Sequence, residues 1–257
     1  MSVPTFFKKT YSSLAQRRNK LISPRGQSFI ELALVLPVLL LLLLGVVEVA
    51  IFIGRYLDVL DLTREAARFA SGSEPSFPDG DLSPPGKTCD PGFYHFYYST
   101  ACIFSPPAGS ATCRPNDPFC NGLNPFILLN PETDDVVISV YTVAGHAVTD
   151  QWPAGGGYWA LSDHDEDTAH NGNWQRNCQG DVVRTAPNFT ADFVTAGVDN
   201  PASPSSKGYV AVEMYYCYRQ VLNLPIFTQF VPNPIQIHAY TIMSNPAAQP
   251  SPTPRLP

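Results

Sequence analysis

The chain has 257 residues, of which 16 are basic and 22 are acidic, giving a net charge of −6. Six of the basic residues precede residue 27, where no acidic residue occurs, so the rest of the chain carries ten basic residues against all 22 acidic ones. Nucleic-acid binding requires a basic patch, and an acidic chain of this kind argues against it.

A membrane-length apolar segment follows the basic N-terminus. Residues 32–54 contain one charged residue, Glu48, and a helix of that length crosses about 30 Å of hydrocarbon. The segment is longer than the core of a secretory signal peptide, and no small-residue cleavage site follows it closely. We therefore expect a basic leader at residues 1–26 and a single transmembrane helix at residues 27–55. Because positively charged segments stay in the cytoplasm, residues 56–257 are expected outside the cell membrane.

All six cysteines follow the membrane segment, which fits an oxidising compartment outside the cytoplasm. Six cysteines allow 15 pairings, and the sequence alone does not choose among them. Structural disulfides are favoured over free thiols. The sequence contains no CxxC motif, so a zinc site built from paired cysteines is not expected. The pairs that we favour are Cys89–Cys102, Cys113–Cys120 and Cys178–Cys217.

Helical periodicity continues beyond the membrane segment. At 100° per residue, the charged residues after Arg55 fall in one arc, and most apolar residues fall on the opposite side. Gly72 and the prolines that follow it are a stop signal. We expect one long helix over about residues 28–71, with an amphipathic extension at residues 56–72 that can cover a sheet.

Alternating apolar residues predict three strands in the outer part of the chain. A long helix with a small antiparallel sheet gives an α+β fold, with an extracytoplasmic domain at residues 73–245. The predicted strands are residues 135–143, 209–218 and 235–243.

Two long stretches between these elements, residues 72–134 and 144–207, are expected to be irregular and held by disulfides, with their tyrosines and phenylalanines packed on the sheet. They form either an inert surface or a recognition surface. Residues 246–257 are rich in proline and are expected to be a disordered tail.

Gly26 is followed by Gln27-Ser28-Phe29-Ile30-Glu31, which resembles the processing site of type IV pilin-like proteins, where a prepilin peptidase cuts after the glycine. The strings FIELALVLPVLLLLLLGVVEVA and LTREAARFAS further on resemble the TadE-like pseudopilins of tight-adherence (Flp-type) pilus systems. The resemblance implies cleavage between Gly26 and Gln27. It also implies that the new ammonium, of the same or a neighbouring subunit, pairs with Glu31. Alternatively, Glu31 lies at the membrane interface beside Arg25.

Glu48 is an acidic residue inside the membrane segment, and such residues are functional candidates. Arg55 follows it by seven residues, about two turns along the same helix face. One interpretation is that Glu48 makes helix–helix contacts in an assembly. The other is that it lies near the outer headgroups, neutral or paired with Arg55.

Asp163, Asp165 and Asp167 alternate as at the start of a calcium loop, but Thr168 and Trp174 stand where that loop requires glycine and glutamate. A solvated acidic loop is therefore favoured over an irregular cation site. The sequence contains no GxSxG, HExxH, P-loop or GxGxxG motif. We expect neither catalysis nor a cofactor.

The sequence thus predicts a membrane-anchored TadE-like pseudopilin that acts in pilus assembly or surface adhesion. Its expected partners are the membrane, other pilin-type subunits and a prepilin peptidase. The alternative is a permanently anchored surface protein whose disulfide-bonded outer domain binds a ligand or partner.

Overall fold

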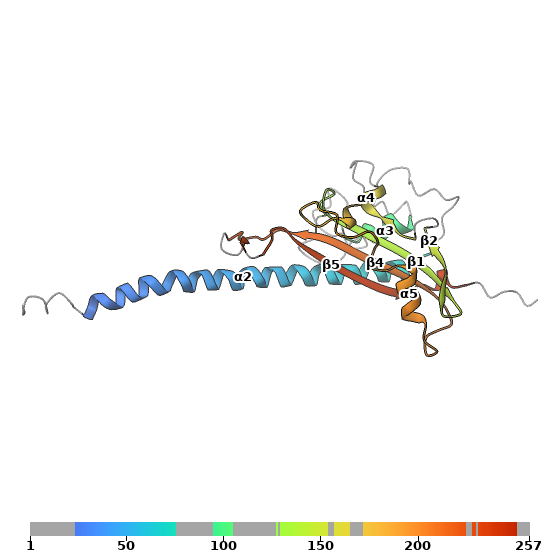
Figure 1. Cartoon of the computed structure of the whole chain (residues 1–257), viewed down its shortest axis with the longest axis horizontal. Helices are drawn as coiled ribbons and strands as arrows, with labels where there is room; N and C mark the ends of the chain where they lie inside the picture. Colours follow the sequence, from blue (N-terminus) through green and yellow to red (C-terminus); the bar gives the residue numbers. More distant parts are fainter. Residues whose placement is uncertain are drawn as a thin grey trace, which may run out of the picture. The chain divides into compact units, whose positions relative to one another are not determined.

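Helix α2 (Pro24–Ser71) is the first element of the described chain (Figure 1). The computed structural model describes residues 24–75, 95–104, 127, 129–153, 157–164, 172–224, 228–229 and 231–250, with only the backbone for residues 24–27 and 164. The chain divides into two units, residues 1–50 and residues 51–257. We call the second unit the head.

Helix α2 changes character along its length. From Ser28 to Leu40 every side chain is exposed, although most of them are apolar. In the outer part, Val59, Leu62 and Ala66 are buried, and the charged side chains of the opposite arc form exposed ion pairs one turn apart, Asp61–Arg64 and Glu65–Arg68. The predicted long helix with an amphipathic outer face is confirmed.

The head contains an antiparallel sheet whose strands follow the order β2-β1-β4-β5, with β3 paired to β1 (Figure 1). The three predicted strands, residues 135–143, 209–218 and 235–243, correspond to β1 (Asp135–Ala144), β4 (Ser206–Tyr218) and β5 (Ile235–Ser244). The predicted α+β class is therefore confirmed. Strands β2 (Ala147–Trp152) and β3 (Trp159–Ala160) lie in a stretch that was predicted to be irregular.

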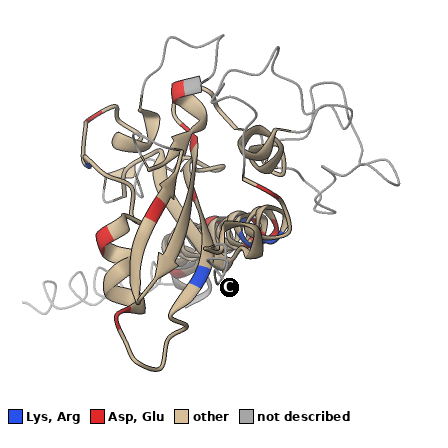
Figure 2. Ribbon diagram, turned by 90° about the vertical axis from the view of Figure 1, so that its right-hand side faces the viewer, with Lys and Arg blue, Asp and Glu red and all other residues tan. Residues whose placement is uncertain are grey.

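Both faces of the sheet are covered. One face packs Ile138, Val212 and Ala239 against the outer part of α2 and the short helix α3 (Phe96–Ala101). The other face packs Tyr141 and Ala211 against Phe189 and helix α5 (Ala191–Val198). Figure 2 shows the sheet between α2 and α5. The remaining short helices are α4 (Leu161–His164) and the 3-10 turns η1 (Asn173–Gln175) and η2 (Pro246–Ala248).

The prediction that residues 72–134 and 144–207 are irregular throughout is wrong, because they contain α3, β2, β3 and α5. Strand β2 forms a hairpin with β1 through Gly145 and His146, whose φ angles are +62° and +65°. A two-residue turn with positive φ at both central positions matches the twist of a hairpin. The expectation that tyrosines and phenylalanines of these stretches pack on the sheet is confirmed for Tyr97 and Phe189.

The C-terminal segment is ordered beyond the predicted start of the tail. Asn245 is fully buried, and its side-chain amide donates to the carbonyls of Ala70 and Ser73, both at 3.2 Å. Ala248 is also buried and accepts a hydrogen bond from the Thr142 hydroxyl at 2.9 Å. These contacts hold the chain across the end of α2 as far as η2 (Pro246–Ala248), and residues 251–257 of the predicted tail lie outside the described residues.

Candidate functional site

The predicted processing site lies in the first turn of α2. Gly26 and Gln27 are the third and fourth residues of the helix, and the first four N–H groups of a helix have no intrahelical partner. Helix ends of this kind fray. The helix is continuous from Gln27 to Glu31, and residues four apart share a face. A new ammonium at Gln27 would therefore lie about one turn from Glu31.

Helix α2 is the one helix among the described residues that is long and apolar enough to cross a membrane. By length and composition, its apolar part is a candidate membrane span near the N-terminus. Glu48 lies within this part and is 8% exposed. Arg55, at the end of the apolar part, forms an ion pair with Asp58 at 3.7 Å. The proposed roles of Glu31 and Glu48 in helix pairing stay predictions.

Glu213 of β4 is a buried carboxylate on the face of the sheet that packs against α5. Its side chain is 1% exposed and accepts hydrogen bonds from the N–H groups of Asn188 (3.0 Å) and Phe189 (2.9 Å). The Tyr215 hydroxyl donates to it at 2.7 Å, and His238 Nε2 lies 3.1 Å away. Burial raises the pKa of Glu213, but these hydrogen bonds, led by that of His238, outweigh the effect and lower it below its usual value.

A stack of three side chains, His238, Tyr215 and Arg184, lies beside this carboxylate. The ring of His238 lies parallel to that of Tyr215, with centroids 4.3 Å apart. The Arg184 guanidinium lies 4.6 Å from the Tyr215 centroid and also donates to the Gln236 side chain at 2.6 Å. The stack joins the segment between η1 and α5, which contains Arg184, to β4 and β5. No local signal in the sequence indicates it, because Arg184 and Tyr215 are far apart along the chain.

Two further carboxylates, Asp134 and Asp135, are buried at the start of β1. Asp135 accepts hydrogen bonds from the Ser162 hydroxyl (2.6 Å), the Ser162 N–H (3.0 Å) and the Trp174 N–H (2.9 Å). Burial nevertheless raises the pKa of Asp135 to about 7. Asp134 accepts from the Cys217 N–H at 2.8 Å. Both residues connect separate segments to the sheet, which indicates a structural role.

A disulfide joins Cys178 to Cys217 and fixes the segment between η1 and α5 to the end of β4. This is one of the three pairs that we favoured. Cys102 is also disulfide-bonded, but its predicted partner, Cys89, lies outside the described residues. The remaining predicted pair, Cys113–Cys120, lies outside them as well.

The weak cation site is only partly described. Asp163 accepts a hydrogen bond from the Gly172 N–H at 2.6 Å. Asp165 and Asp167 lie outside the described residues. In the part of the chain that the structure describes, no group of three or more His, Cys, Asp or Glu side chains is placed to hold a metal ion.

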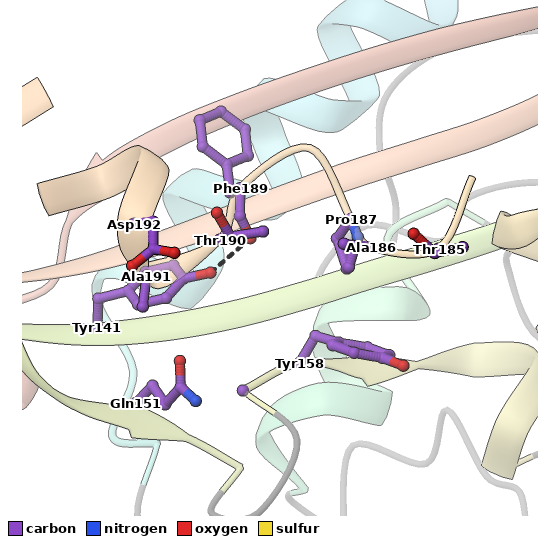
Figure 3. Close-up of a pocket in the computed structure, with 11 residues that line it drawn as sticks. Tyr141, Gln151, Tyr158, Thr185, Ala186, Pro187, Phe189, Thr190, Ala191 and Asp192 are labelled. Carbon is purple, nitrogen blue, oxygen red and sulfur yellow. Dashed lines mark hydrogen bonds between the residues drawn. The ribbon is translucent and has the colours of Figure 1, made fainter. Parts of the chain in front are cut away.

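A cleft of about 270 Å³ lies on the second face of the sheet, between residues 185–192 and the β2 strand (Figure 3). The Tyr141 hydroxyl at its centre donates to the Phe189 carbonyl at 2.6 Å. Tyr158, Gln151 and Asp192 face the cleft with a phenol, an amide and a carboxylate. The described lining has no His, Cys or Lys.

Comparison with known families matches residues 26–68 to the model of the TadE-like protein family. This segment is TadE-like. The match begins at the predicted cleavage glycine and covers the apolar part of α2 and most of its amphipathic extension. The resemblance predicted from the sequence is confirmed for this segment. The comparisons with curated proteins and with solved structures found no match.

Proposed function

We propose that this protein is a TadE-like pseudopilin that acts in the assembly of a Tad (Flp-type) pilus or in surface adhesion. The observation that carries the proposal is the two-part helix α2, most of which is TadE-like. Its outer part is packed on the head sheet, while the large apolar side chains between Phe29 and Leu40 are exposed. Lipid or a bundle of similar helices would cover such a surface.

The helix would be inserted with residues 1–26 in the cytoplasm and the head outside, because the basic residues precede the span. A prepilin peptidase would then cut between Gly26 and Gln27. The new ammonium would pair with Glu31 of the same or an adjacent subunit and set the register between packed helices. Glu48 would add a second polar contact in the outer part of the bundle.

Mass spectrometry of the mature protein tests the cleavage step. We expect a chain beginning at Gln27 in cells that have the peptidase, and the full chain in cells that lack it. Gly26→Leu should block cleavage. Gly54→Ala is the matched control, because a Cβ there meets no atom within 4 Å. A mature protein that keeps residues 1–26 in the presence of the peptidase would contradict the proposal.

Surface labelling tests the orientation. Val182 lies in the head and is 59% exposed, so a Val182→Cys variant should react with a membrane-impermeant maleimide on intact cells. Labelled protein from lysed cells gives the total. If the variant reacts only after lysis, the head is cytoplasmic and the proposed topology is wrong.

The alternative function, a permanently anchored protein whose head binds a ligand, is favoured by the cleft beside Tyr141 (Figure 3). Its phenol, amide and carboxylate groups suit a small polar molecule. The same mass spectrum separates the two functions, since a permanent anchor requires no cleavage after Gly26.

A further inference from the structure

A second cleft lies where α2 meets the head sheet. Its volume is about 250 Å³, and Ile51 and Arg55 of α2 form one wall. Asp134 before β1, and Tyr216 and Arg219 at the end of β4, form the others. Two guanidinium side chains from segments far apart in the sequence therefore line one small cavity.

The position of this cleft along α2 corresponds to the membrane surface. Arg55 is the first basic residue after Arg25, and the 30 residues between them rise about 45 Å in a helix. This matches the 40–45 Å thickness of a bilayer with its headgroups. With Arg25 at the inner headgroups, Arg55 and its cleft lie at the outer headgroups.

Arg55 lacks a partner that satisfies its guanidinium. Its Nη1 atom is buried and makes no hydrogen bond. The nearest ion-pair partner, Asp58, lies 3.7 Å away, and its side chain is 34% exposed. Buried polar groups are normally hydrogen-bonded, so an N–H group of this kind indicates a place for an acceptor.

The carboxylate in the cleft is already engaged. Asp134 accepts hydrogen bonds from the N–H groups of Asn130 and Cys217, both at 2.8 Å, and from the Thr133 hydroxyl at 3.1 Å. Burial also raises the pKa of Asp134, despite these bonds and the charge of Arg219. Its oxygens are thus held by the protein backbone and are poorly placed to satisfy Arg55.

We propose that this cleft binds the phosphate of a phospholipid headgroup from the outer face of the membrane, through Arg55 and Arg219. Guanidinium groups match the geometry of phosphate oxygens. Ile51 offers an apolar wall for the glycerol and upper acyl chain, and the nearby Tyr218 packs on Phe52 with ring centroids 5.4 Å apart. A lipid bound there would hold the head on the membrane before α2 enters a fibre.

Native mass spectrometry of the full chain in detergent micelles tests this proposal, which rests on the proposed membrane insertion but not on cleavage after Gly26. The probes are dioleoyl phosphatidylglycerol, dioleoylglycerol with the same acyl chains, and inorganic phosphate. We expect the phospholipid to bind. Dioleoylglycerol should not bind, and inorganic phosphate should bind at least about a hundredfold more weakly. Binding of dioleoylglycerol with equal affinity, or of inorganic phosphate with equal affinity, would overturn the assignment to a lipid phosphate.

Variants identify the site. Arg55→Gln and Arg219→Gln should each weaken phospholipid binding by roughly tenfold, the usual effect of losing a charge-assisted hydrogen bond. Arg55→Lys, which keeps the charge, should retain part of the affinity. Arg64→Gln is the matched control, because Arg64 is exposed on the same helix and pairs with Asp61. Tryptophan fluorescence checks that each variant is folded. If the folded Arg55→Gln variant binds the phospholipid as well as wild type, the site is refuted. This result would not affect the proposed pilin function, which a mature N-terminus at Gln27 would still support.

Discussion

Replacing Glu213 with alanine tests whether this buried carboxylate holds the segment between η1 and α5 on the sheet. The change would leave the N–H groups of Asn188 and Phe189, the Tyr215 hydroxyl and His238 without their acceptor. Removing one partner from a buried charged network costs about 3–5 kcal/mol of unfolding free energy. For a domain of about 200 residues, 1 kcal/mol corresponds to roughly 2–4 °C in Tm, so the midpoint should fall by about 6–20 °C.

Tryptophan fluorescence of the full chain in detergent micelles measures this change. All three tryptophans lie in the head, and Trp159 and Trp174 are fully buried, so the signal reports the head rather than the membrane helix. Glu132→Ala is the matched control, since Glu132 is exposed and surface substitutions change stability by less than about 0.5 kcal/mol. A Glu213→Ala midpoint within about 2 °C of the control would refute the role of the network.

The pH dependence of this difference has a definite sign. Because the folded protein lowers the pKa of Glu213 below the ordinary value of 4.5, the ionised carboxylate stabilises the fold above that pH. This contribution disappears as the pH falls through the lowered pKa. The gap between wild type and Glu213→Ala should therefore narrow below about pH 4.5. A gap that stays constant from pH 7 to pH 3 would show that the charge is not the source of the stability.

Three other changes follow from the same packing. Gly208→Ala would place a Cβ 2.1 Å from a backbone oxygen, and it should lower the unfolding free energy by at least about 1–3 kcal/mol in denaturant titrations. Gly197→Ala is the control, because its Cβ meets open space, and it should leave the unfolding free energy unchanged or raise it by up to about 1 kcal/mol. Because its pKa is raised, folded Asp135 keeps its proton up to about pH 7, so the Tm should fall as the pH rises from about 4 to about 7. Asp135→Asn should flatten that slope in melting experiments over the same pH range. Replacing Cys178 and Cys217 together by serine opens a loop of 39 residues and should lower the unfolding free energy by about 4 kcal/mol in the same titrations. An unchanged denaturation midpoint would show that this cross-link does not stabilise the head.

The sequence predicted the elements with long and regular patterns. Helix α2 and strands β1, β4 and β5 each extend over ten or more residues, so their periodicity is visible without tertiary information. Strand β2 has six residues, of which the central ones are polar and exposed. Helix α5 has eight residues, and so short a helix gives few turns in which periodicity can be recognised.

The buried carboxylates were missed for a different reason. Glu213 stands on the second face of β4, and alternation along one strand does not show whether that face meets water or another layer. The N–H groups that donate to it, at residues 188 and 189, lie 25 and 24 residues away along the chain. They follow proline and threonine in a segment that has no strand or helix pattern. Only the tertiary fold brings these groups together.

The placement of apolar surface ties the fold to the proposed function. Both faces of the head sheet are covered, one by the outer part of α2 and the other by the segment held through Glu213 and the Cys178–Cys217 disulfide. The large exposed apolar side chains of the described chain are instead concentrated in the inner part of α2, from Phe29 to Val49. Helix packing in a membrane or a fibre can therefore change without opening the core of the head. A protein whose helix moves from lipid into an assembly needs this separation, because one part must exchange neighbours while the other keeps its fold.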